Sequence, residues 1–410
     1  MTLVRAEAGA VLVKPSPTAM VWHEVGRPHE SIAVPGLELR EGEALVEVEL
    51  ATICGSDVHT VLGHRRSPAP SVLGHEQVGH VVALGPGGAA TVDGTPLALG
   101  DRIVWSVTAS CGHCERCLRG LSQKCLALRK YGHERLERGW ELSGGFATHV
   151  HLRAGTAIVR VPEHLAAELA APAACSTATA VAAVEAGAAQ FGTRAPGPGG
   201  TSTTGTSPAD PGGEPRGEPL GVTVLISGAG MIGIAATAIV SEAGATVVVV
   251  DPDPARRATA LRFGADVVLD PGEGPLAAQL AALAAPAPLV AIEASGAVSS
   301  VRSVIDACAV GGTVVLVGSV SPGPAVELDP EQVVRRLLTI TGVHNYAPRH
   351  LQRAIGFLSG SPGTFGRDHL VGARFALDDL DTAIEVAASG AHVRVAIDPR
   401  AVRPHDTVEG

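Results

Sequence analysis

Four of the seven cysteines in this chain fall within one short segment, and their spacing indicates metal chemistry. The segment reads C-x2-C-x2-C-x7-C and contains Cys111, Cys114, Cys117 and Cys125. Four thiolates at such intervals can surround one tetrahedral zinc ion and leave no coordination position open, so we expect a structural zinc site. A ferredoxin-type iron–sulfur cluster usually has a last spacing of three residues followed by proline, whereas here the last spacing is seven and Leu126 follows. Four unligated thiols are the remaining alternative.

A glycine-rich segment between two apolar runs predicts a dinucleotide site. The segment 228–233, GAGMIG, follows a strand-like run at 222–227 and opens a helix-like run that ends near residue 243. In a βαβ unit, such glycines let the backbone approach a pyrophosphate at the positive N-terminal end of the helix. A glycine turn in an ordinary α/β domain is the alternative. The residues that we expect to bind the cofactor here are Gly228, Gly230, Met231, Ile232 and Gly233.

Asp251 ends the next strand-like run and predicts which dinucleotide binds. An acidic side chain at this position accepts hydrogen bonds from the ribose hydroxyls of NAD and repels the additional phosphate of NADP. We therefore expect NAD as the cofactor. Arg256 and Arg257 follow closely in the sequence and weaken this preference.

The order of the expected elements predicts two domains. Residues 19–160 alternate short β-type runs with glycine and proline turns, and residues 163–190 are alanine-rich and helix-like. Residues 193–219 contain no large apolar side chain and are expected to form a mobile loop. From residue 222 onward, strand-like and helix-like runs alternate, which predicts an α/β domain with a doubly wound parallel sheet. After residue 345, two helix-like segments and one strand-like segment are expected to rejoin the first domain.

Composition excludes several classes of protein. The chain has 410 residues and a formal net charge of −10 with no basic block, so we expect no nucleic-acid partner. No run of 18 or more residues is continuously apolar, so we expect no membrane span. We interpret residues 1–17 as a short extension without the apolar core of a secretion signal. Seven cysteines are too few for a disulfide scaffold of this length, which favours a cytoplasmic protein.

Three further segments complete a resemblance to a known family. They are 53–59 (ICGSDVH), 73–79 (LGHEQVG) and 171–180 (APAACSTATA). Together with the four-cysteine loop and the glycine-rich segment, they resemble the zinc-containing medium-chain alcohol dehydrogenases. The resemblance covers about residues 19–400 and departs from the family at 193–219. It implies a GroES-like β-rich catalytic domain at 19–178, a Rossmann domain at 179–345, and a return to the catalytic domain at 346–410.

The resemblance also assigns roles to individual residues. Cys54, His75 and Cys175 would bind a catalytic zinc with an open fourth position, giving two zinc ions per chain. Glu76 would be a further ligand or a close neighbour of the metal, and Asp57 would accept the other ring N–H of His75. The remaining assignments are Ser56 and His59 for passing the proton outward, and Thr179 for contacting the nicotinamide. Buried core roles are the alternatives for His75 and Cys175, and Cys308 is expected to be a core thiol.

The implied reaction is hydride transfer between an alcohol and NAD, yielding an aldehyde or ketone. Segments at 120–125, 130–133 and 142–146 are similar to a subgroup associated with phosphonate catabolism, so Arg65, Arg66 or Lys130 could receive an anionic substrate. The family further implies a homodimer or homotetramer. Two other hypotheses remain open: a zinc-free reductase of quinones or enoyl thioesters on the same fold, and a non-catalytic NAD- and zinc-binding structural or sensor protein.

Overall fold

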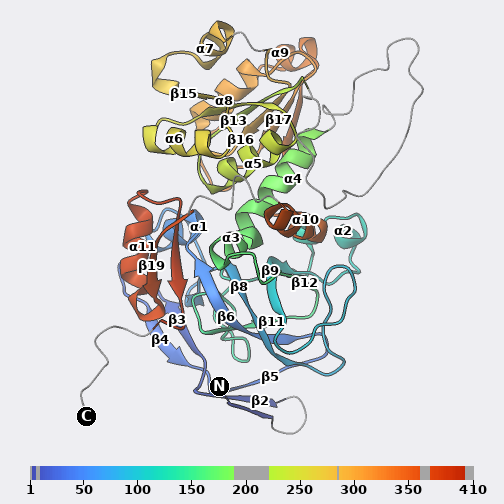
Figure 1. Ribbon diagram of the computed structural model, residues 1–410, viewed down its shortest axis with the longest axis vertical. Coiled ribbons are helices and arrows are strands. Elements are labelled where there is room, and N and C mark those ends of the chain that lie inside the picture. The colour runs from blue at the N-terminus through green and yellow to red at the C-terminus, as the bar shows by residue number, and fades with distance from the viewer. Residues whose placement is uncertain (1, 6–9, 189–220, 284–285, 361–369, 402–410) are drawn as a thin grey trace. The chain divides into compact units, whose positions relative to one another are not determined.

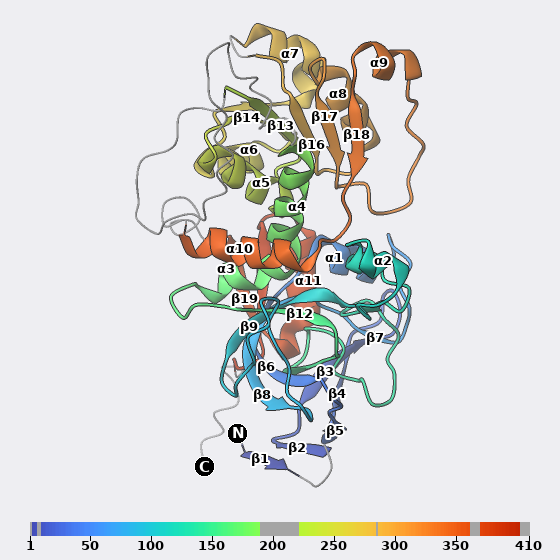
Figure 2. The same ribbon diagram turned by 90° about the vertical axis from the view of Figure 1, so that its right-hand side faces the viewer.

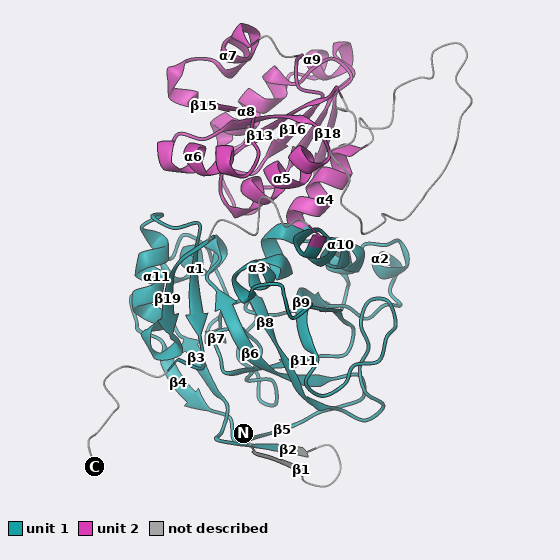
Figure 3. Ribbon diagram, in the orientation of Figure 1, with its two compact units in different colours: residues 1–178, 345–359, 366–410 teal, residues 179–344, 360–365 magenta. Residues whose placement is uncertain are grey.

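The computed structural model describes residues 2–5, 10–188, 221–283, 286–360 and 370–401. By its internal contacts the chain divides into two compact units (Figure 3). Unit 1 comprises 1–178, 345–359 and 366–410, and unit 2 comprises 179–344 and 360–365. The sequence predicts domain boundaries at 178/179 and 345/346, and the two units divide at 178/179 and 344/345. The loop expected at 193–219 lies outside the described residues.

Unit 1 is built around an eight-stranded, mainly antiparallel sheet (Figure 1). Its main strand order is β10-β9-β8-β6-β20-β19, with β11 paired to β6 and β12 paired to β9. The strands are β6 (Ala44–Thr52), β8 (Glu76–Leu84), β9 (Arg102–Ala109), β10 (Arg129–Lys130), β11 (His149–Leu152), β12 (Thr156–Arg160), β19 (Val371–Ala376) and β20 (Arg394–Asp398). These bounds confirm the β-rich first domain that the sequence predicts.

The N-terminal segment that we interpret from the sequence as a short extension contributes two strands to unit 1. β1 (Thr2–Arg5) pairs with β2 (Ala10–Lys14), and β2 pairs with β5 (Gly36–Glu38). Val11 and Val13 are only 4% and 1% exposed, because they pack into an apolar cluster of this unit. A second small sheet contains β3 (Thr18–Trp22), β4 (Glu30–Ala33) and β7 (Ser71–Val72).

The last strand of unit 1 enters the same sheet as one of its first strands. β20 pairs antiparallel with β6, with Ala396 opposite Thr52 and Ile397 opposite Ala51. Helix α11 (Leu380–Ala388) packs against β20 and against α1 (Gly55–Val61). The remaining helices of this unit include α2 (Glu115–Leu118) and α10 (Pro348–Gly360).

A long apolar helical run begins in the core of unit 1 and continues from Thr179 onward as part of unit 2. It consists of α3 (Ala167–Pro172), a π-helical turn η2 (Ala173–Thr177) and α4 (Ala178–Gly187). By length and hydropathy, 167–187 is the one run among the described residues that could cross a membrane, yet 72% of its most apolar window is buried inside the protein. α3 and η2 pack against strands β6, β8 and β9, as a core helix does.

Unit 2 contains a six-stranded, entirely parallel sheet (Figure 2). Its order is β15-β14-β13-β16-β17-β18, which in chain order reads 3-2-1-4-5-6 and is the Rossmann arrangement. The strands are β13 (Thr223–Ser227), β14 (Thr246–Val250), β15 (Val267–Leu269), β16 (Val290–Glu293), β17 (Thr313–Leu316) and β18 (Thr339–Gly342). The connecting helices are α5 (Met231–Glu242), α6 (Pro254–Arg262), α7 (Leu276–Ala282), α8 (Val298–Ala307) and α9 (Pro330–Arg335). The doubly wound sheet predicted from the sequence is confirmed.

Candidate functional site

Three side chains from distant parts of the sequence converge in unit 1. The ligand atoms of Cys54, His75 and Cys175 all lie within 4.8 Å of one another. Cys54 follows β6 and caps the N-terminus of α1, and His75 immediately precedes β8. Because β6 and β8 are paired, the two residues meet at one edge of the sheet. Cys175 comes from the π-helical turn η2, a local irregularity that often marks a functional site.

Asp57 holds the imidazole of His75 from one side. Its fully buried carboxylate accepts hydrogen bonds from the backbone N–H groups of Cys54 at 3.0 Å and Gly74 at 3.3 Å. The Oδ1 atom also lies 3.4 Å from Nδ1 of His75. Burial disfavours the charged imidazole, but the nearby Asp57 carboxylate and Cys54 thiol prevail and raise the pKa of His75 to about 10. This arrangement leaves Nε2 of His75 for a metal ion, as a carboxylate behind a histidine ligand does.

The backbone around His75 permits only glycine at two positions. Gly74 has a φ of +89°, and a Cβ atom there would lie 2.8 Å from the Phe146 backbone nitrogen. A Cβ atom on Gly132 would lie 2.3 Å from the Gly74 carbonyl oxygen. This close approach brings the next residue, His133, against His75, with their ring centroids 4.6 Å apart. The segment after β10 therefore packs directly against the ligand cluster.

Glu76 is held beside this cluster by other polar groups. Its buried carboxylate accepts hydrogen bonds from the hydroxyls of Thr52 and Ser176, both at 2.7 Å. The Arg394 guanidinium donates to it at 2.8 and 2.9 Å. Burial raises the pKa of Glu76, whereas Arg394 acts in the opposite direction. Glu76 is thus not among the converging ligand atoms, and its role as a zinc ligand stays a prediction.

Sequence reasoning missed Arg394, Thr52 and Ser176. Arg394 begins β20, and its Nη2 atom also lies 4.0 Å from Sγ of Cys54. The only sequence signal was a charged residue within the apolar run HVRVAID, which is unusual for a buried strand. Nothing in the spacing connects that residue to Glu76, because the contact depends on the pairing of β20 with β6.

The converging side chains fit a zinc ion. A hydrogen bond from the Cys175 thiol, followed by His75 and Arg394, keeps the pKa of Cys54 well below its usual value. Two thiols and one imidazole form a donor set that zinc prefers, and three protein ligands are typical of catalytic zinc sites. The observation that supports this fit is the convergence of three such atoms from three separate elements.

Of the two residues predicted to pass the proton outward, Ser56 and His59, only Ser56 lies beside the cluster. The Ser56 hydroxyl lies 3.4 Å from Nε2 of His75. His59 is exposed on the same helix, with its ring centroid 5.7 Å from that of His64. Within the described part of the chain no hydrogen bond joins Ser56 to His59, so the relay stays a prediction.

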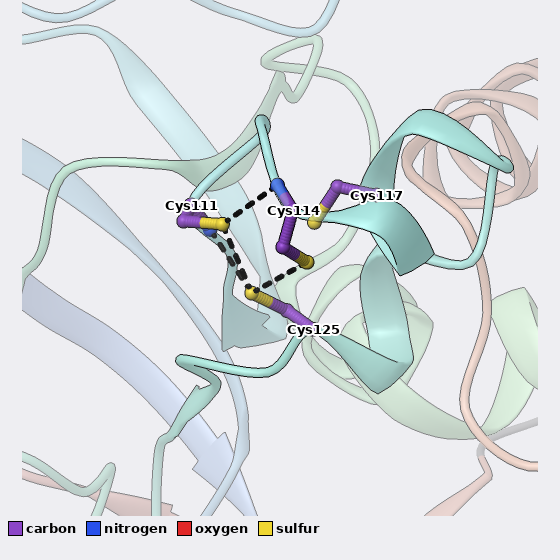
Figure 4. A group of neighbouring side chains, drawn as sticks. All are labelled: Cys111, Cys114, Cys117 and Cys125. Carbon is purple, nitrogen blue, oxygen red and sulfur yellow. Dashed lines mark hydrogen bonds between the residues drawn. The ribbon is translucent and has the colours of Figure 1, made fainter.

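The four cysteines of the C-x2-C-x2-C-x7-C segment form a second cluster (Figure 4). All four sulfur atoms lie within 4.8 Å of one another, and the Sγ atoms of Cys111 and Cys125 are 3.4 Å apart. Backbone N–H groups point at the sulfurs, as from Ala127 to Cys125 at 3.3 Å. Backbone hydrogen bonds, foremost that of Leu126, lower the pKa of Cys114 to about 6. This donor set fits a closed tetrahedral zinc site. Cys308 is buried and belongs to neither cluster.

The glycine-rich segment of unit 2 forms a narrow turn before helix α5. Gly228 has a φ of +99°, and a Cβ atom on Gly233 would lie 1.8 Å from the Gly228 carbonyl oxygen. Gly230 caps α5, and Met231 and Ile232 form its first turn. A pocket of about 550 Å³ adjoins the turn and is lined by Gly228, Gly230, Asp251 and Arg256 among others. These features fit the pyrophosphate cradle that the sequence predicts.

Asp251 reaches this pocket from the end of β14. It is 4% exposed, and its two carboxylate oxygens accept hydrogen bonds from the backbone N–H groups of Ala229 at 2.8 Å and Asp253 at 2.9 Å. Each oxygen retains a further lone pair for a ribose hydroxyl. Thr179 lies on α4 and does not line this pocket, so its nicotinamide contact stays a prediction.

The fold and these sites define an oxidoreductase that uses zinc and a nicotinamide dinucleotide. Residues 40–163 match the family described as alcohol dehydrogenase GroES-like domain, and residues 232–360 match the zinc-binding dehydrogenase family. Geraniol dehydrogenase of Castellaniella defragrans is 30% identical over 92% of this chain and 96% of its own length. The chain therefore belongs to the zinc-dependent medium-chain alcohol dehydrogenases, and it is an enzyme.

Two other similar proteins support the assignment. 5-exo-hydroxycamphor dehydrogenase of Pseudomonas putida is 26% identical over 90% of this chain and 95% of its own length. A protein from Sinorhizobium meliloti 1021, whose crystal structure contains NADP, is 27% identical. It superposes with a TM-score of 0.74 and covers 94% of this chain and 99% of its own. The resemblance stated from the motifs is confirmed at the level of the family.

Proposed function

We propose that this enzyme transfers a hydride between an alcohol and NAD, with Cys54, His75 and Cys175 holding a catalytic zinc. The convergence of these three ligand atoms, in a chain of the zinc-dependent dehydrogenase family, is the observation that carries the proposal. The four-cysteine cluster would hold a second, structural zinc. Aldehydes or ketones are the corresponding products or substrates.

The bound zinc would lower the pKa of the substrate hydroxyl, and the bound nicotinamide would take up the hydride. The protein supplies orientation and charge balance. Asp57 fixes the ring of His75, and two thiolates with a neutral imidazole offset the charge of a divalent cation. The Ser56 hydroxyl lies where it can take a proton at Oγ, and the exposed His59 can deliver that proton to solvent.

NAD is the cofactor that we propose over NADP. The buried Asp251 at the end of β14 carries a negative charge beside the pocket, which disfavours a ribose phosphate. Arg256 also lines this pocket and would favour the phosphate, and the Sinorhizobium meliloti protein contains NADP. The buried carboxylate of Asp251 outweighs Arg256 in the choice of dinucleotide, because Arg256 is exposed and its Nε atom lies 3.8 Å from Oδ2 of Asp253.

We further propose that the substrate carries an anionic group, such as a phosphonate. Arg65 follows α1, where its backbone N–H donates to the His59 carbonyl, and Lys130 lies on β10 two residues before the Gly132 turn. Burial and the charge of Arg65 lower the pKa of Lys130, while the thiols of Cys175 and Cys54 act in the opposite direction. The two cations therefore lie near each other and near the ligand cluster.

Neither cation has a carboxylate partner within the described residues, since no ion pair involves Arg65 or Lys130 there. Two unpaired cations next to a metal site favour an anion between them, because charge-assisted hydrogen bonds to phosphonate oxygens would offset their repulsion. The relatives named for geraniol and 5-exo-hydroxycamphor take their names from uncharged alcohols. The proposed substrate class would thus differ from theirs.

Metal analysis together with cofactor assays tests the proposed reaction. We expect two zinc ions per chain and alcohol-dependent reduction of NAD, with a higher kcat/KM for NAD than for NADP. Cys54→Ser and Cys175→Ser should each remove one zinc and lower kcat/KM about a thousandfold or more, because the metal supplies several kcal/mol to the reaction. Cys114→Ser serves as the control that disturbs only the other cluster.

Other results would favour the competing hypotheses. Full activity in Cys54→Ser would indicate a zinc-free reductase. One zinc per chain without any turnover would indicate a non-catalytic binding protein. Equal kcat/KM with both dinucleotides would contradict the proposed preference for NAD.

The anionic substrate is tested by comparing hydroxyalkyl phosphonates with neutral alcohols of the same length. Arg65→Ala and Lys130→Met should each lower kcat/KM for the phosphonates by about 10- to 100-fold, the size of a lost charge-assisted hydrogen bond. Their kcat/KM for neutral alcohols should change little. The exposed Arg119 provides the control, because Arg119→Ala removes the same charge from a residue outside the predicted anion-binding set. Equal losses in all three variants, or no preference for the phosphonate, would contradict the proposal.

We also propose that the enzyme is a cytoplasmic homodimer or homotetramer. The small number of cysteines for a chain of this length favours a reducing compartment, and cell fractionation is the check. β18 forms one edge of the unit 2 sheet and offers backbone groups to a second copy.

A further inference from the structure

The π-helical turn η2 changes the backbone hydrogen bonds around Cys175. In a regular α-helix the Ala178 N–H would donate to the carbonyl of Ala174, four residues before it. Here the Ala178 N–H donates to the carbonyls of Ala173 and Cys175 instead. The Ala174 carbonyl, directly before the cysteine, therefore loses its α-helical donor.

Tyr346 supplies another donor to this carbonyl. Its hydroxyl donates to the Ala174 carbonyl and lies near the backbone of Val107 on β9. The side chain is 5% exposed, and burial raises the pKa of Tyr346 well above its usual value. A carbonyl oxygen can only accept a hydrogen bond, so the Tyr346 hydroxyl is the donor in this contact. All three residues belong to unit 1.

The residue directly before Tyr346 has a left-handed backbone conformation. Asn345 directly before it has a φ of +55°, in the left-handed region that asparagine tolerates better than most residues. Helix α10 begins two residues after Tyr346. The tyrosine is thus fixed between a left-handed residue and a helix start.

The residue on the other side of Cys175 is also held. The Ser176 hydroxyl donates to Glu76 and lies next to the Arg394 guanidinium, which donates to it at 2.5 Å. Cys175 consequently lies between two anchored neighbours, Ala174 and Ser176. The contact that holds Ala174 comes from Tyr346, which makes no described hydrogen bond with Glu76 or Arg394.

We propose that Tyr346 is a positioning residue for the metal site: through the Ala174 carbonyl, its hydroxyl fixes the Cys175 thiol relative to Cys54 and His75. The inference rests on the proposed catalytic zinc site. Without the hydroxyl, the π-turn can relax toward a regular helix, which rotates Cys175 about the helix axis. Groups that orient a metal ligand in this way typically contribute 10- to 100-fold to metal affinity.

The chain offers a matched control, since it contains only two tyrosines. Tyr131 is also fully buried, and its hydroxyl bonds to Thr156 at 2.7 Å and accepts from the Arg153 N–H at 2.8 Å. Tyr346→Phe and Tyr131→Phe each remove one buried hydroxyl and leave the ring in place. Both variants should lose a similar amount of unfolding free energy, whereas only Tyr346→Phe should change the affinity of one metal site.

The experiment uses metal ions alone, with no substrate or dinucleotide. Metal-free full-length protein is titrated with Zn²⁺ against a chelator, and with Co²⁺, whose thiolate absorption bands report each site. We expect Tyr346→Phe to weaken one of the two sites about 10- to 100-fold and to shift its Co²⁺ bands. The four-cysteine site and the thermal midpoint should match those of Tyr131→Phe.

Three outcomes would overturn the inference. Equal affinities and Co²⁺ spectra in both variants would show that the hydroxyl does not act on the metal site. Loss of both sites in Tyr346→Phe would show a general folding role instead of selective positioning. If the wild-type protein bound metal only at the four-cysteine cluster, the proposed catalytic zinc would fail together with the inference, whereas the first two outcomes leave that zinc intact.

Discussion

Two buried carboxylates next to the same thiols have different partners and therefore different tasks. Asp57 accepts backbone N–H groups and faces His75, whereas Glu76 is neutralised by Arg394. Breaking a buried ion pair by removing one member costs about 3–5 kcal/mol, because the other charge stays without compensation. Arg394 is therefore a structural requirement of the site. The motifs could identify the carboxylates, but they could not identify the cation that balances one of them.

His149 should make the stability of the protein depend on pH. It is 5% exposed on β11, and burial lowers its pKa to about 4. The pKa of an unfolded histidine is about 6.5, so the unfolded state binds more protons between these two values. The stabilising effect of the neutral ring is complete above about pH 6.5 and is lost as the pH falls toward 4, by up to about 3 kcal/mol.

The prediction is checked by urea unfolding between pH 7.5 and 4.5. His149→Gln should reduce the loss of unfolding free energy on acidification relative to the wild type, because glutamine has no proton to bind. The exposed His164 provides the control, and His164→Gln should follow the wild-type curve. Parallel curves for all three proteins would contradict the assignment.

At the level of elements, the sequence predicted those with a clear apolar pattern. The β-type runs at 44–50, 77–84 and 101–107 predict three strands, and β6, β8 and β9 begin and end within two residues of them. The glycine-rich turn opens α5 as expected. The π-turn could not be predicted, since an alanine-rich helix shows the same composition with or without one extra residue in a turn. β18 was also missed, because it is short and only half-buried. The elements that went unpredicted include the one that carries Cys175.

At the level of the whole molecule, the alternation of strands and helices and the family motifs were sufficient for the fold class. They could not supply the pairing of β20 with β6, which brings Arg394 to Glu76 beside the Cys54–His75–Cys175 cluster. Tyr346 and Arg394 were missed because each contacts a residue far away in the sequence, and no local pattern marks such a contact. Cys54, His75 and Cys175 converge as the family motifs imply, because those motifs carry the residue types and the local spacing, and their role as zinc ligands stays a prediction.

The proposed oligomer should depend on the exposed edge of unit 2. Val310, Val334 and Leu337 are 64%, 71% and 71% exposed, and the Gly311 N–H donates to the Arg336 carbonyl, which brings their segments together. Light scattering should give a mass of two or four chains for the wild type. The double variant Val334→Glu/Leu337→Glu should give one chain if the wild type is a dimer, and one or two chains if it is a tetramer. Leu118, 75% exposed in unit 1, gives the control variant Leu118→Glu. An unchanged mass in the double variant would place the interface elsewhere.

The contacts of Arg394 with Glu76 and Ser176 can form only after most of the chain has been synthesised. Arg394 is added to the growing polypeptide 318 residues after Glu76 and 218 residues after Ser176. At a ribosomal rate of about 5–20 residues per second, the nascent chain carries its thiols and its acidic neighbour for roughly tens of seconds before the balancing cation emerges. The buried ion pair beside the Cys54–His75–Cys175 cluster therefore forms late, and a ribosome that stalls before β20 releases a polypeptide that lacks this cation.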